Sequence, residues 1–259
     1  MASCFKLALV QMMVEGTKEL NHIKAKKLIN EAAKNGAKVV VLPEFFTSRC
    51  DPKVFLEVME PVPNGPTFQL LSEAARENEI FLFGGTYPEA SGKPEMFGNL
   101  CNIFNPRGEL IGQHRKNHMF DVDLGPRLRI TESQKVIPGN TFTSVTTGCN
   151  LLIYMGAFSI KHGRVQWDVL SKARAVDNQV YVASVGPATD EKSPYVTWGH
   201  SLVVSPWGEV IASCESEEAI VYADIDLDYL KEVRRMLPIE NQRRNDLYKT
   251  VDLTNGTSV

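Results

Sequence analysis

The chain has 259 residues, of which 43% are hydrophobic and 23% are charged, enough to bury a core as one globular domain. Its formal net charge is -3 and no basic stripe runs along it, so a nucleic-acid partner is not expected. The five cysteines are widely scattered without a Cys-x-x-Cys pair, so neither a disulfide framework nor a metal site is expected.

The first half of the chain alternates predicted strands with predicted helices. Strands are expected at 5–14, 39–42 and 80–86, helices at 25–32 and 66–75, and a hairpin at 99–114 turned by Pro106-Arg107-Gly108. The segment 45–63 is expected to be irregular.

Glu44 lies directly after the predicted strand 39–42, because Pro43 has no N–H and stops the strand. The carboxyl ends of buried strands are where open α/β sheets gather their functional residues, so Glu44 is a candidate general base. A strand-end glutamate that caps a helix or pairs with a surface cation fits this position equally well.

The second half begins with a cationic cluster, 114–118, which is either a solvated loop or a segment that brings Lys116 near Glu44. Turn residues with little periodicity follow at 121–140, and a short β-prone run follows at 141–147. Beyond them we expect strands at 150–154, 180–185 and 220–225, a helix at 165–176, and a hairpin at 200–213 turned by Pro206-Trp207-Gly208.

No linker, repeat or low-complexity segment interrupts the chain, which predicts one α/β domain, 1–250, and a polar tail, 251–259. The chain shows no signal peptide and no long apolar run. This predicts a cytoplasmic protein, with mitochondria as the alternative, and no membrane partner.

The common nucleotide, zincin and serine-hydrolase motifs are absent from the sequence. Five other motifs occur in order: Pro43-Glu44-Phe45; Arg115-Lys116 with His118 and Phe120; Tyr154 with Gly156-Ala157-Phe158; Arg174-Ala175-Val176-Asp177-Asn178; and Trp198-Gly199-His200-Ser201 with Pro206-Trp207-Gly208-Glu209. Together they resemble the nitrilase (carbon–nitrogen hydrolase) superfamily, most of all its omega-amidase branch, from about Phe5 to about Tyr248.

The resemblance implies a nitrilase-like α-β-β-α sandwich, a homodimer, no metal or organic cofactor, and hydrolysis of a small-molecule amide through a Cys–Glu–Lys triad. By motif, Glu44 matches the general base, Lys116 the lysine that stabilises the oxyanion, and Glu132 a supporting glutamate beside that lysine. The chemistry agrees with these roles, because a thiol attacking an amide needs a base and a cation where negative charge develops.

The sequence departs from the family where the nucleophile should lie. The family carries a strand, a cysteine elbow and a helix there, whereas this chain passes from Thr147 directly to Gly148-Cys149-Asn150. We therefore expect no catalytic cysteine and a sandwich disrupted after Thr147. Cys149 begins a strand instead of ending one, so it is expected roughly 15–20 Å from the site. Cys50 lies on a loop near Glu44 and is interpreted as an idle thiol.

A second departure concerns the expected substrate wall at Phe158. Lys161 and Arg164 follow it, where the family's omega-amidases carry small hydroxylated residues. These two cations are candidates for holding a substrate carboxylate, and a solvated loop at the start of a helix is the alternative.

Three functions are compatible with the sequence. The first is an omega-amidase-like enzyme that releases ammonia from dicarboxylic monoamides such as 2-oxoglutaramate and 2-oxosuccinamate. The second is a catalytically inactive member or truncated isoform that acts through binding or dimerisation. The third is an interaction module that uses Thr257-Ser258-Val259, which has the form of a PDZ ligand.

Overall fold

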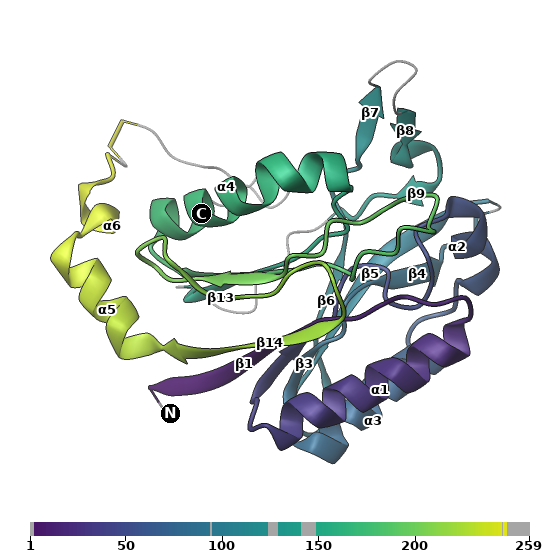
Figure 1. The fold of residues 1–259 in the computed structure, drawn as a ribbon, viewed down its shortest axis with the longest axis horizontal. Helices are drawn as coiled ribbons and strands as arrows, with labels where there is room; N and C mark the ends of the chain where they lie inside the picture. The colour runs from purple at the N-terminus through teal and green to yellow at the C-terminus, as the bar shows by residue number, and fades with distance from the viewer. Residues whose placement is uncertain (1–2, 94, 124–128, 141–148, 245, 248–259) are drawn as a thin grey trace.

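The computed structural model describes residues 3–93, 95–123, 129–140, 149–244 and 246–247. Two β-sheets face each other, with helices α1 (Lys18–Lys34) and α3 (Pro66–Asn78) on one side and α4 (Ile160–Asn178) on the other (Figure 1). These four layers form an α-β-β-α sandwich, so the predicted fold class is confirmed.

The larger sheet follows the strand order β14-β1-β2-β3-β5-β4, and β6 and β9 also pair with β5. Strands β1, β2 and β3 run parallel, so their carboxyl ends meet at one edge, where Glu44 lies. The bounds are β1 (Cys4–Gln11), β2 (Val39–Val41), β3 (Phe81–Phe83), β4 (Tyr87–Ala90), β5 (Phe97–Phe104), β6 (Leu110–Arg115), β9 (Val136–Ile137) and β14 (Ala219–Asp226).

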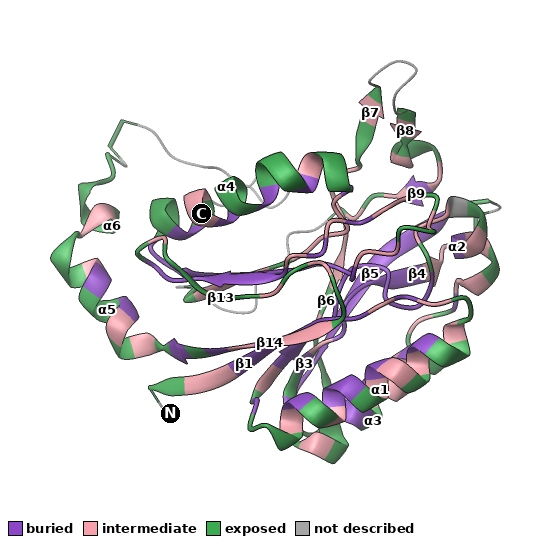
Figure 2. Cartoon of the chain, in the orientation of Figure 1, coloured by how far each residue is buried: buried purple, intermediate pink, exposed green. Residues whose placement is uncertain are grey.

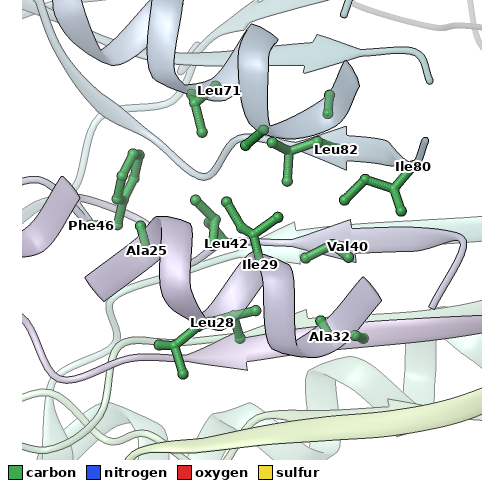
Figure 3. Packing of buried hydrophobic residues seen from close by; sticks show 14 of the residues in the cluster. Ala25, Leu28, Ile29, Ala32, Val40, Leu42, Phe46, Leu71, Ile80 and Leu82 are labelled. Atoms are coloured by element: carbon green, nitrogen blue, oxygen red, sulfur yellow. The ribbon is translucent and has the colours of Figure 1, made fainter. Parts of the chain in front are cut away.

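Helix α1 forms because apolar residues recur at helical spacing behind a capping threonine. The Thr17 side chain accepts a hydrogen bond from the N–H of Leu20, which satisfies a donor at the helix start. The apolar face then packs onto the larger sheet. Figure 3 shows this contact, in which Ala25, Leu28, Ile29 and Ala32 lie over Val40 and Leu42.

The smaller sheet follows the order β10-β11-β12-β13 and is covered by α4. Strand β10 pairs in parallel with β11, and no other described strand pairs with its free side. Buried residues fill the space between the two sheets, while much of α4 remains exposed (Figure 2). The bounds are β10 (Leu151–Met155), β11 (Tyr181–Val185), β12 (Leu202–Val204) and β13 (Val210–Ser213).

Two of the sequence predictions are wrong in detail. The segment 45–63 contains α2 (Pro52–Val58), because the Asp51 side chain accepts from the N–H of Lys53 and Pro52 suits a first helical turn. The turn-rich segment 121–140 contains β9 and three short elements that pair or pack locally. These elements are β7 (Asp121–Asp123), β8 (Arg129–Thr131) and the 3-10 turn η2 (Glu132–Gln134).

Two helices follow the last strand, β14. They are α5 (Leu227–Met236) and the short α6 (Ile239–Gln242). The β-prone run 141–147 and the tail 251–259 lie outside the described residues. In the part of the chain that the structure describes, no helix is both long and apolar enough to cross a membrane.

Candidate active site

Glu44 is a buried carboxylate whose two oxygens both accept hydrogen bonds. Its side chain follows the end of β2, and the residue is 8% exposed. Oε1 lies 2.8 Å from Nδ2 of Asn99, which comes from β5, and 3.4 Å from Nζ of Lys116. Oε2 lies 2.7 Å from the backbone N of Ala157, which follows β10 in the other sheet. The carboxylate therefore joins the two sheets.

Lys116 lies directly after β6, and its position is set by the backbone. Its N–H donates to the carbonyl of Asn99 at 2.9 Å, which continues the pairing of β5 with β6. Its Nζ lies 3.0 Å from Oε1 of Glu132, whose Oε2 accepts from the N–H of Phe120 at 2.6 Å. The structure thus brings together the three residues Glu44, Lys116 and Glu132, two of which follow strand ends as the sequence predicted.

One ammonium is shared between two carboxylates in this cluster. The side chains of Glu44 and Glu132 are 10% and 12% exposed, and that of Lys116 is 29% exposed. Burial by itself lowers the pKa of Lys116, but the adjacent carboxylates outweigh it and raise the pKa above its ordinary value. Lys116 therefore stays charged at neutral pH and can donate to an oxygen on which negative charge develops.

The described thiols lie away from this carboxylate or are enclosed in apolar surroundings. Cys149 is exposed at the start of β10, and Ala157, which donates to Glu44, follows the other end of that strand. Cys149 and Ala157 thus lie at opposite ends of β10, so the strand separates Cys149 from Glu44, as the sequence predicted. Cys50 packs against the apolar cluster formed by Phe45, Phe55, Phe97 and Val136, and burial raises the pKa of its thiol. It lines a cavity of about 20 Å³ together with Glu44.

The three candidate substrate residues separate into a packed aromatic and two exposed cations. Phe158 is half-buried and contacts Trp167 edge to face, with ring centroids 5.1 Å apart. Lys161 and Arg164 are both exposed, within the first five residues of α4. Both residues lie within the helix and not in a loop before it, and the structure shows neither in the Glu44–Lys116–Glu132 cluster.

Sequence reasoning missed three groups that position the cluster. Asn99 and Ala157 donate directly to Glu44, and the hydroxyl of Tyr195 donates to the carbonyl of Ala157 at 2.9 Å. The motif Gly156-Ala157-Phe158 drew attention to this region by its resemblance to the family, but it did not predict that the N–H of Ala157 donates to Glu44. Asn99 lies inside a strand, and the sequence alone does not show whether such an asparagine donates to a carboxylate or only fills the core. Among the described residues, no three His, Cys, Asp or Glu side chains gather in a way that could hold a metal ion.

Comparison with known proteins agrees with the sandwich fold. The sequence profile of the carbon-nitrogen hydrolase family matches residues 6–148 and 135–235. The chain is 46% identical over 277 residues to the omega-amidase NIT2-B of Xenopus laevis, covering 97% of this chain and 99% of that one. It is 43% identical over 270 residues to the human omega-amidase NIT2, covering 94% and 96%.

Solved structures show the same fold. Saccharomyces cerevisiae Nit3, a member of branch 10 of the nitrilase superfamily, superposes with a TM-score of 0.83 at 33% identity, covering 93% of this chain and 97% of that one. The C. elegans NitFhit protein superposes with a TM-score of 0.84 at 25% identity, covering 96% and 69%. The sandwich is thus that of a hydrolase of carbon–nitrogen bonds. The chain belongs to the carbon-nitrogen hydrolase family, within the nitrilase superfamily, and its relatives are omega-amidases.

Proposed function

We propose that this chain is an omega-amidase-type protein that binds the terminal amide of small dicarboxylic monoamides, 2-oxoglutaramate or 2-oxosuccinamate, and turns them over very slowly. The similarity to omega-amidases over nearly the whole chain supports the substrate class. The arrangement at Glu44 supports the low rate, because its oxygens accept from Asn99, Lys116 and Ala157 and from no described thiol.

Two further observations support the absence of a nucleophile. The family profile matches in two segments that overlap at 135–148, as expected when a part of the family pattern is missing near Thr147. The alignment with the Xenopus laevis relative runs over 277 positions, more than the 259 residues of this chain, so part of it lies opposite gaps here. In this proposal the missing positions are the strand, cysteine elbow and helix of the family.

The roles of the cluster follow from its charges. Lys116 donates to the amide oxygen of the bound ligand, and Glu132 holds the ammonium in place from the other side. Glu44 is the group that would take a proton from a nucleophile. With water as the nucleophile in place of a thiol, hydrolysis to the carboxylate and ammonia still balances, but the covalent route that divides the barrier is lost.

The test measures binding and turnover separately. We expect ammonia release from 2-oxoglutaramate to stay at background, while the ligand raises the unfolding temperature of the protein. Lys116→Arg should abolish the ligand-dependent rise, and the exposed Lys172→Arg is the matched control. Release of ammonia at the rate of an intact relative would contradict the proposal, and Cys50→Ala would then show whether that thiol is the nucleophile.

The alternative is an inactive member that acts through dimerisation and binds no amide. A homodimer and a cytoplasmic location are part of our proposal. Exposed apolar residues on α4, Val165 at 69% and Val169 at 64%, favour a partner surface on that helix. Sedimentation of the Val165→Asp variant should show a shift toward monomer, and no ligand-dependent rise in the wild-type protein would favour this alternative over binding.

A further inference from the structure

A serine and a histidine at the start of α4 are hydrogen-bonded to each other, and the candidate active site uses neither of them. Oγ of Ser159 lies 2.8 Å from Nδ1 of His162. This separation is within the range at which a base takes a proton from a nucleophilic hydroxyl. Ser159 is 8% exposed and His162 is half-buried, so the pair is largely shielded from water but is not sealed inside the core.

The ordinary role of a serine at a helix start does not account for this pair. Ser159 is the N-cap residue of α4, and an N-cap serine usually accepts a hydrogen bond from an N–H of the first turn. Within the described chain, the Ser159 side chain makes no such bond. Its backbone carbonyl accepts from the N–H groups of His162 and Gly163, at 3.0 and 2.8 Å. The hydroxyl is therefore available to the imidazole.

Both residues of the pair are held by neighbouring segments. Gly163 lies so close to Trp198 that a Cβ atom there would be 2.2 Å from Cγ of the indole, so the helix start rests directly on Trp198. The ring of His162 meets that of Phe120 edge to face, with the ring centroids 5.5 Å apart. This contact orients the imidazole, which is the task that a carboxylate performs in a Ser-His-Asp triad.

Two sets of contacts connect the pair to the candidate active site. The imidazole ring contacts Phe120, whose N–H donates to Oε2 of Glu132. On the other side, Tyr195 hydrogen-bonds to Ser159 and donates to the carbonyl of Ala157, whose own N–H donates to the general-base candidate. Burial raises the pKa of Tyr195, so its hydroxyl keeps its proton at neutral pH. The pair therefore adjoins the candidate site.

The surroundings of the pair favour the negative charge that develops during attack on a carbonyl. Helix α4 has 19 residues, and the N-terminal end of such a helix carries a partial positive charge. Lys161 and Arg164 add two exposed cations within the first five residues of the helix. When a serine oxygen attacks a carbonyl carbon, the carbonyl oxygen becomes negative, so this end of the helix stabilises the tetrahedral species.

We propose that Ser159 and His162 form a catalytic dyad that hydrolyses small activated acyl esters. The Ser159 oxygen attacks the ester carbonyl carbon, and its proton passes to Nδ1 of His162. The bond between that carbon and the alcohol oxygen then breaks, and the leaving alcohol takes the proton. Water attacks the acyl-serine in the same way, which releases the carboxylic acid and restores the hydroxyl. The proposal concerns esters alone, so it leaves the expected background release of ammonia unchanged.

The test uses the complete chain and a small fluorophosphonate, which attaches to an activated serine oxygen with loss of fluoride. We expect mass spectrometry to find the adduct on Ser159, formed at least about 100-fold faster than on Ser213, an exposed serine at the end of β13. Hydrolysis of p-nitrophenyl acetate should use the same residue, so Ser159→Ala should reduce it to background. Labelling of Ser159 no faster than that of Ser213 would overturn the proposal, as would full hydrolysis by Ser159→Ala.

Variants of His162 separate proton transfer from support of the fold. His162→Gln keeps a side chain that hydrogen-bonds to Ser159 but does not take up its proton. Labelling should fall by at least about 100-fold in this variant, while its unfolding temperature stays near that of the wild type. His162→Ala should lose the reaction equally, and imidazole in the buffer should restore part of it.

The matched control is His22→Gln, because His22 is another histidine that bonds to a side-chain hydroxyl, that of Thr67 at 2.9 Å. This variant should leave the labelling of Ser159 unchanged. Equal labelling in the wild type and in His162→Gln would overturn the proposal. So would the absence of any recovery when imidazole is added to His162→Ala, because His162 would then act only by supporting the fold.

Discussion

Strands β2 and β10 have similar apolar sequences but very different surroundings. Val40 and Val41 of β2 are completely buried, because β1 and β3 pair on either side and α1 covers one face. Tyr154 of β10 is 43% exposed, because β11 is its only pairing neighbour among the described strands. The difference teaches that an apolar strand is buried only to the extent that its neighbours are present.

The candidate site likewise draws on both sheets, and each sheet contributes different groups. Glu44 and Lys116 follow strands of the complete sheet, and their charges are held by hydrogen bonds from Asn99 and the backbone. The smaller sheet contributes the N–H of Ala157, but no described thiol. The described residues thus form the charged part of the site, whereas in our proposal the segment that would carry the nucleophile is missing.

The largest predicted effect comes from completing the smaller sheet. Inserting the strand–elbow–helix segment of an omega-amidase relative between Thr147 and Gly148 should raise ammonia release from 2-oxoglutaramate. Loss of the nucleophile in subtilisin costs about 10⁶ in kcat, so a gain approaching that size is expected. The same insertion with the elbow cysteine replaced by alanine is the control. Equal rates with and without that cysteine would contradict the missing-nucleophile interpretation.

The second prediction tests the charges on the complete sheet. Lys116→Ala leaves the buried Glu44 and Glu132 carboxylates side by side without their shared cation. We expect the free energy of unfolding to fall by about 3 kcal/mol, as for other broken buried pairs. Lys172→Ala, which breaks an exposed pair with Asp168, should cost less than about 1 kcal/mol in the same urea titration. Equal losses would show that the cluster at Lys116 is effectively solvated.

The third prediction compares the residue directly after β2 with a residue of β10. Leu42→Ala removes a fully buried side chain next to the complete sheet and should cost about 3 kcal/mol or more. Leu152→Ala removes a half-buried side chain of the edge strand and should cost about 1 kcal/mol. Urea unfolding of both variants measures the difference. A Leu152→Ala loss as large as that of Leu42→Ala would mean that β10 is covered more completely than its exposure indicates.

The smallest predicted effect is a pH dependence on the helical side of the complete sheet. Burial, and then the nearby Lys18, lower the pKa of His22, whose ring bonds to Thr67 at 2.9 Å. The unfolded state therefore binds the proton more readily, so stability is present above about pH 6.5 and falls as the pH drops below it. His22→Gln should flatten this slope in urea titrations from pH 7 to pH 5. If His22→Gln leaves the pH dependence of the unfolding free energy unchanged, other titratable groups cause that dependence.

The sequence alone determined the layers of the fold and the positions of Glu44 and Lys116. The strand before Glu44 is a short apolar run that ends at Pro43, and the strand before Lys116 follows the turn at Pro106-Arg107-Gly108, so both are visible as local signals. The order of the motifs placed the chain in the carbon-nitrogen hydrolase family, which the relatives confirm. The helix α2 was missed although Asp51 and Pro52 carry its start signal.

Only the tertiary structure decided which donors hold Glu44 and how far β10 is covered. Asn99 and Ala157 come from different sheets, so no local pattern predicts that they meet on one carboxylate. The exposure of Tyr154 likewise depends on which strands pair beside it, because an apolar run in the sequence describes a strand but not its neighbours. Each residue's preference for helix or strand can be inferred from the local sequence, whereas its burial depends on how the sheets assemble.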